Sequence, residues 1–176
     1  MKSRSFLDAH ALRHAFVGNA LGRLVDVISE QGDTLLEAAG LSFPSRASST
    51  MLLIEERGDL SIADITRELR QPHQLVAQRI DLLAEKGLVV RMADPSDGRR
   101  KILRLSSKGK KEAVILKERL QGAAIAFDEI FDEIGVNLSE AAEAASVALK
   151  HVSLGERINA LNQKPRQKKN QRATTR

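Results

Sequence analysis

Two short helical segments joined by a tight turn, with two strand-like segments directly after them, constrain the fold of this chain most. The first segment, 61–69, opens on a serine that an aspartate follows three residues later, which is the mark of a capping box. Pro72 favours extended backbone at the residue before it, so the connection to the next segment is short. The second segment spans 73–86 and ends at Gly87, where glycine commonly terminates a helix. This spacing predicts a helix-turn-helix.

A β-hairpin is expected immediately after the second helix. Residues 88–92 and 101–105 are rich in aliphatic and β-branched side chains. Between them lie Asp94-Pro95 and Asp97-Gly98, which are two turn signals. A hairpin in this position is a wing, so the segment predicts a winged helix-turn-helix.

The rest of the sequence is predicted to be helical. Residues 6–38 place apolar side chains at a seven-residue spacing, as in a coiled-coil seam. Such a seam packs either on the chain's own core or on a helix of a partner subunit, and its length favours the partner. Further helices are expected at 44–57, at 107–134, and from a cap at Ser139 to about Leu161. The predicted fold class is mainly α, a winged helix-turn-helix with long terminal helices and a two-stranded wing.

Positive charge gathers in the hairpin. The 176-residue chain has 28 basic and 23 acidic residues, a formal net charge of +5. Residues 88–111 carry eight basic and two acidic groups, whereas 112–163 have a net charge of −5 and 164–176 of +6. This concentration in and after the hairpin indicates a surface that faces phosphates. The alternative is a charged hairpin that is merely solvated.

Composition excludes several classes of protein. The chain has no cysteine, which excludes disulfides, thiol catalysis and cysteine metal sites. Aromatic residues make up 3%, which argues against stacking on single-stranded nucleic acid. No glycine-rich phosphate loop, nucleophile elbow or HExxH motif is present, so we expect neither an enzyme nor a cofactor. The absence of a signal peptide and of a long apolar run predicts a cytoplasmic protein with no membrane partner.

Five short motifs lie along the helix-turn-helix and the hairpin. In chain order they are Leu60-Ser61-Ile62-Ala63-Asp64-Ile65, Ile80-Asp81 with Leu83, Glu85-Lys86-Gly87-Leu88-Val89 with Arg91, Asp94-Pro95-Ser96-Asp97-Gly98-Arg99-Arg100, and Leu105-Ser106 with Gly109. Together and in this order they resemble the winged helix-turn-helix of the multiple-antibiotic-resistance-regulator (MarR) family. Ser106 stands where the family's wing motif ends in threonine.

The resemblance implies an architecture and a set of partners. It implies a homodimer whose terminal helices interlock, and a transcription factor that binds a near-palindromic operator in double-stranded DNA. It also implies a repressor that a small-molecule inducer releases. We therefore expect one domain over 1–163, with a DNA-binding lobe at 41–111 between dimerisation helices at 6–38 and 112–163. Residues 164–176 hold six basic and no acidic groups and are expected to be a disordered tail that contacts phosphates transiently.

Base-reading residues are expected near the start of the second helix. The outward positions there are His73, Gln74, Ala77 and Gln78. Glutamine can make paired hydrogen bonds to adenine and alanine can contact a thymine methyl, so the two glutamines are the strongest candidates. The alternative is that these are solvated polar residues. The family often has a hydroxyl residue where this chain has Leu75 and an arginine where it has Gln78, which suggests a different operator sequence.

The wing supplies a second group of candidates. Arg99 matches the family's wing-tip arginine, which resembles a minor-groove probe, and narrow A·T-rich grooves attract arginine. Asp97 is expected to hold that guanidinium by a charge-assisted hydrogen bond. Arg100, Lys101 and Arg104 are expected to contact phosphates.

A ligand cleft is also predicted, near the start of the chain. His10 and His14 share a helix face and could in principle bind a metal, but no third ligand is evident, so we expect none. Arg13, Phe16 and Phe43 are expected near the same cleft, where the resemblance places a ligand. The alternative function is a winged-helix protein that mediates protein interactions or shapes DNA without a specific operator.

Overall fold

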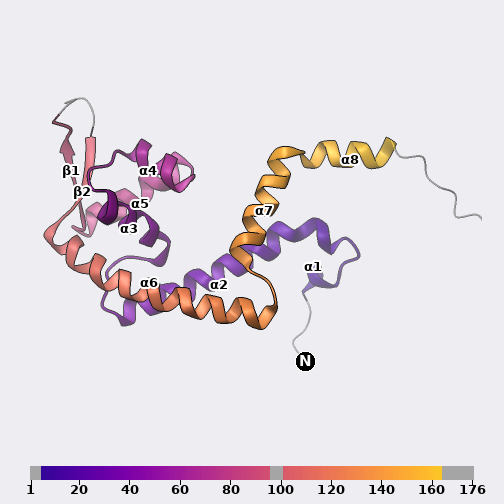
Figure 1. The fold of residues 1–176 in the computed structure, drawn as a ribbon, viewed down its shortest axis with the longest axis horizontal. Coiled ribbons are helices and arrows are strands. Elements are labelled where there is room, and N and C mark those ends of the chain that lie inside the picture. The colour runs from indigo at the N-terminus through magenta and orange to yellow at the C-terminus, as the bar shows by residue number, and fades with distance from the viewer. Residues whose placement is uncertain (1–4, 96–100, 164–176) are drawn as a thin grey trace, which may run out of the picture. The chain divides into compact units, whose positions relative to one another are not determined.

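A computed structural model describes residues 5–95 and 101–163 of the chain. Most of this part is helical and it carries one two-stranded antiparallel sheet, which confirms the predicted mainly α, winged fold (Figure 1). The elements are α1 (Phe6–Ala9), a 3₁₀ turn (Arg13–Phe16), α2 (Val17–Ala38), a second 3₁₀ turn (Ser45–Ala47), α3 (Ser48–Arg57), α4 (Ile62–Leu69), α5 (His73–Glu85), β1 (Val89–Ala93), β2 (Lys101–Leu105), α6 (Ser107–Ile134), α7 (Leu138–His151) and α8 (Leu154–Gln163).

Backbone contacts divide the chain into two units, with the boundary between Ala123 and Ala124 inside α6. The first unit holds α1 to α5, both strands and the first part of α6. The second holds the remainder of α6 with α7 and α8. The organisation of residues 1–163 as one domain stays a prediction.

The core of the first unit lies beneath the helix-turn-helix. Val76, Ile80 and Leu83 recur on one side of α5 and are fully buried. They pack in one cluster with Met51 and Ile54 of α3, which are also buried. Figure 1 shows α3, α4 and α5 gathered beside the β1–β2 hairpin. Burial of this stripe fixes which side of α5 faces outward.

Local signals set the limits of α4 and α5 as predicted. The Ser61 hydroxyl accepts a hydrogen bond from the Asp64 N–H at 3.2 Å, and the Asp64 carboxylate accepts one from the Ser61 N–H at 3.0 Å. Arg70 follows α4 with φ 50°, in the left-handed region. Gly87 follows the C-cap of α5 and stops the helix with φ 70°. Glycine adopts this left-handed conformation without strain because it has no Cβ. The capping box and the glycine stop are confirmed.

The hairpin pairs β1 with β2 in antiparallel register, with Val89 opposite Leu105 and Ala93 opposite Lys101. Leu60, just before α4, adds an isolated bridge to Leu103, whose N–H donates to the Leu60 carbonyl at 2.8 Å. The base of the wing is therefore joined to the start of the helix-turn-helix. The tip, residues 96–100, lies outside the described part of the chain.

The prediction of one unbroken helix over 6–38 is wrong in its first third. Helix α1 ends at Ala9 and α2 begins at Val17. His10 Nδ1 accepts a hydrogen bond from the Leu12 N–H at 3.1 Å. Such a local side-chain bond competes with the helical hydrogen-bond ladder, and the seven-residue spacing carries no sign of it.

The prediction of one last helix capped by Ser139 is wrong at its start. The cap is Asn137, whose Oδ1 accepts hydrogen bonds from the N–H groups of Ser139 and Glu140 at 3.0 and 3.1 Å. Asparagine is as good a cap as serine, so composition alone does not decide between neighbours.

The same predicted helix is also broken near its middle. Ser153 Oγ accepts from the Glu156 N–H at 3.3 Å, and the Glu156 carboxylate accepts from the Ser153 N–H at 2.8 Å. This reciprocal pair begins a new helix, α8, after α7 has ended at His151. The serine-to-glutamate spacing that marks this helix start is present in the sequence.

Candidate nucleic-acid interface

The outward side of α5 carries the predicted base-reading residues. His73, Gln74 and Gln78 are exposed, and Ala77 is half-buried. The opposite side of the helix is anchored in the core, so these polar side chains cannot turn inward without unpacking it. The structure therefore places all four on an accessible helix start, and their contact with bases stays a prediction.

The turn between α4 and α5 is held by a side chain of α5. Arg79 Nη1 donates a hydrogen bond to Gln71 Oε1 in the connection. Burial, and secondarily the charge of the nearby Arg46, lower the pKa of the Arg79 guanidinium. Because Arg79 is partly desolvated and bonded to the connection, it fixes the turn to α5.

An ion pair joins the wing to α5. Arg91 of β1 pairs with Asp81 of α5. Arg91 stands opposite Leu103 in the register, on the sheet face that turns toward the core. The pair therefore sets the position of the base of the wing relative to the outward side of α5.

Arg104, a predicted phosphate contact, has a protein partner in this structure. Its guanidinium binds both carboxylate oxygens of Asp59, with Nε at 2.7 Å from Oδ1. This hydrogen bond lowers the pKa of Asp59 and raises that of Arg104. Both side chains are partly exposed, so a phosphate would share or displace Asp59. The phosphate contact of Arg104 stays a prediction.

The other predicted wing residues are placed unevenly. Lys101 is exposed at the start of β2 and makes no ion pair within the part of the chain that the structure describes. Asp97, Arg99 and Arg100 lie outside that part. Lys101 therefore stands as an accessible cation at the start of β2.

A carboxylate that the sequence analysis missed secures α6 to the lobe. Glu112 is 8% exposed, and its oxygens accept hydrogen bonds from the N–H of Ser42 at 3.1 Å and from the Ser42 hydroxyl at 3.0 Å. Lys108 lies 3.7 Å from the same carboxylate. A buried carboxylate is stable only when it is bonded in this way, and sequence spacing does not reveal a partner 70 residues away.

The residues of the predicted ligand cleft are only partly brought together. His10 lies half-buried between two phenylalanine rings, with centroids 5.3 Å from Phe6 and 5.9 Å from Phe16. Arg13 and His14 are exposed nearby in the chain. In contrast, Phe43 is 4% exposed and packs in the core cluster of the lobe. Its predicted place in the ligand cleft stays a prediction. Within the described ranges no three His, Asp or Glu side chains come together as metal ligands.

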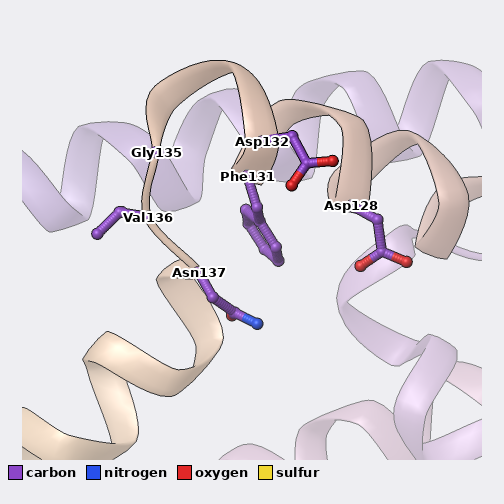
Figure 2. Close-up of a pocket in the computed structure, with 6 residues that line it drawn as sticks. All are labelled: Asp128, Phe131, Asp132, Gly135, Val136 and Asn137. Atoms are coloured by element: carbon purple, nitrogen blue, oxygen red, sulfur yellow. The ribbon is translucent and has the colours of Figure 1, made fainter.

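A pocket is present in the second unit, at the turn between α6 and α7 (Figure 2). It has a volume of about 480 Å³. Figure 2 shows the Phe131 ring between the side chains of Asp132 and Asn137, with the Asp128 carboxylate on the adjoining turn of α6. It shares no residue with the cleft predicted from the sequence. Its two aspartates make it unfavourable for the phosphate of DNA.

Solved structures and one family model resemble this chain. Residues 39–100 match the model of the MarR family. CouR from Rhodococcus jostii RHA1, solved bound to p-coumaroyl-CoA, is 22% identical with a TM-score of 0.54, over 84% of this chain and 94% of that one. The transcriptional regulator BldR from Sulfolobus solfataricus is 18% identical with a TM-score of 0.55, over 80% and 96%. The PcaV regulator from Streptomyces coelicolor, in complex with its natural ligand, is 17% identical with a TM-score of 0.52, over 88% and 99%.

A search of curated protein sequences found no match. In the ranges that the structure covers, no helix is both long enough and apolar enough to cross a membrane. The matched segment contains α3, α4, α5 and β1, which form the helix-turn-helix and the first strand of the hairpin. Residues 39–100 of this chain therefore match the model of the MarR family, and together with β2 they fold as a winged helix-turn-helix.

Proposed function

We propose that this chain is a sequence-specific regulator of transcription that binds double-stranded DNA as a homodimer. The observation that carries the proposal is the outward side of α5, where His73, Gln74 and Gln78 are exposed. The opposite side of the same helix is buried in the core and fixes its orientation. A helix start of this kind fits the major groove, and glutamine forms paired hydrogen bonds with adenine. The basic hairpin beside it supplies charge for phosphates and the minor groove.

Exposed apolar side chains on the terminal helices support a dimer. On α2 they include Leu21, Val25 and Ile28, and on the C-terminal helices Ile125 and Leu161, each at least 38% exposed. Faces of this extent on long helices are typical of surfaces that a partner covers. In a dimer, two copies of α5 would enter successive major grooves about 10 base pairs apart.

Release by a small ligand is the regulatory part of the proposal. CouR was solved with p-coumaroyl-CoA and PcaV with its natural ligand, and both share the fold of this chain. A ligand that binds better to dimers whose α5 helices no longer match the groove spacing would shift the population away from DNA. p-Coumaroyl-CoA is a suitable first probe, and retained DNA binding at saturating probe would exclude that compound as the inducer.

Selection from a random duplex pool tests the DNA-binding proposal. We expect an enriched near-palindrome, and we expect Gln78→Ala to weaken its binding by roughly 1–3 kcal/mol in a fluorescence-anisotropy titration at fixed salt. Gln121→Ala, an exposed glutamine on α6, is the matched control and should bind as the parent does. A pool without enrichment would favour the protein-interaction or DNA-architectural alternative.

A further inference from the structure

An apolar side chain stands among the polar residues on the outward side of α5. Leu75 is 38% exposed, although Val76 beside it is fully buried. In the described part of the lobe, 41–95 and 101–111, the exposed large apolar side chains are Leu75, Val90 and Met92. Val90 and Met92 lie on β1 of the wing, so Leu75 is the one on the helix start.

Helical geometry places Leu75 with the base-reading candidates. Residues three apart lie about 60° from each other around a helix, so Leu75 and Gln78 share one side of α5. Val76, Ile80 and Leu83 point into the core from the other side. Leu75 and Ala77 therefore flank Gln78 on opposite sides, and of the two Leu75 is the more exposed.

We infer that Leu75 contacts the 5-methyl group of a thymine in the DNA that α5 binds, which makes it a specificity-determining residue of the interface. The inference rests on the proposed function. In the major groove the thymine methyl is the apolar feature among hydrogen-bonding groups, so an exposed leucine beside glutamines matches an A·T pair. Burial of one methyl-sized group is worth roughly a fourfold change in affinity.

Replacement of thymine by deoxyuridine removes only that methyl group and gives a direct test. An operator enriched by the full-length parent is synthesised with deoxyuridine at each thymine in turn, placed symmetrically in both half-sites. The affinities of the parent, Leu75→Ala and Leu75→Met are then measured at one salt concentration. For the parent we expect one position at which deoxyuridine weakens binding about fourfold per half-site, and therefore roughly sixteenfold when both half-sites are replaced.

The variants decide whether Leu75 senses that methyl. In Leu75→Ala the penalty at the same position should largely disappear, whereas Leu75→Met, which keeps an apolar side chain of similar reach, should retain it. Val90→Ala, another exposed apolar residue of the lobe, is the control and should keep the parent's penalty. Thermal melting of each variant establishes that it is folded.

The failure of this inference and that of the proposed function are distinguishable. A pool with no enriched duplex overturns the proposed function, and the inference with it. An enriched operator with no thymine whose methyl penalty depends on residue 75 overturns the inference alone. A methyl penalty that shrinks equally in Val90→Ala would also overturn it, because the effect would then not be specific to Leu75.

Discussion

Gly109 has only a hydrogen atom as its side chain, and this allows the first turn of α6 to pack against the backbone of Leu88 at the base of the wing. A Cβ built at this glycine would lie 2.1 Å from the carbonyl oxygen of Leu88, which is backbone and cannot move aside. We predict that Gly109→Ala lowers the free energy of unfolding by about 1–3 kcal/mol, as over-packing does. Urea denaturation measures the effect.

Gly122, on the same helix, is the matched control for this prediction. Apart from its chain neighbours and the adjacent backbone of α6, nothing in the described chain lies within 4 Å of a Cβ built there. Gly122→Ala should therefore stabilise by up to about 1 kcal/mol, because alanine is the better helix former. Equal effects of the two substitutions would contradict the close approach at Gly109.

At the scale of elements, the start of α7 has two candidate N-cap residues, and the one in the structure differs from the one predicted from the sequence. Ser139 and Asn137 are both residues that favour helix starts, and the structure uses the asparagine. We predict that Asn137→Ala destabilises the helix start by about 1 kcal/mol, whereas Ser139→Ala has little effect. Hydrogen exchange at residues 139–141 measures this difference, and a larger loss of protection in Ser139→Ala would restore the cap that the sequence suggested.

Most elements between Ser48 and Ile134 could be predicted from the sequence because local chemistry sets their ends. The Ser61–Asp64 capping box and Gly87 act over a few residues, so reading along the chain finds them. The break after Ala9 was not predicted because it depends on one side chain that bonds to nearby backbone in place of the helical ladder. The break after His151 has a local signal of the same spacing, Ser153 and Glu156, but it lies within an apolar pattern that by itself predicts one continuous helix.

At the scale of the whole molecule, the terminal helices leave apolar surface uncovered. Ile125 on α6 is 64% exposed, and a partner subunit is the cover we propose for it. We predict that the chain sediments as a dimer and that Ile125→Asp shifts it toward monomer, since a charge buried without a partner is costly. Sedimentation velocity at several concentrations measures the shift.

Arg119→Asp is the control for that experiment, because it places the same carboxylate at an exposed polar position on α6 and changes the net charge even more than Ile125→Asp does. It should leave the dimer intact. A parent chain that is monomeric at every concentration would contradict the homodimer, and with it the spacing of two α5 helices on one operator.

The candidate interface was predictable in part. The exposed positions of α5 follow from helical periodicity, because the buried residues Val76, Ile80 and Leu83 define the opposite side. The exposure of Leu75 did not follow, since periodicity leaves a residue at the edge of the buried stripe undecided. The partner of Arg104 did not follow either, because Asp59 lies 45 residues earlier in the chain.

By itself the sequence determined the helix-turn-helix, the wing and the concentration of charge, since each depends on contacts among near neighbours. The net charge of residues 1–163 is −1, so the basic character of the interface rests on where the charges stand and not on their total. Tertiary structure alone decided which cations keep a protein partner, which carboxylate is buried against Ser42, and where Phe43 lies. Those outcomes depend on side chains far apart in sequence that meet only after the core has packed, and no local pattern encodes such meetings.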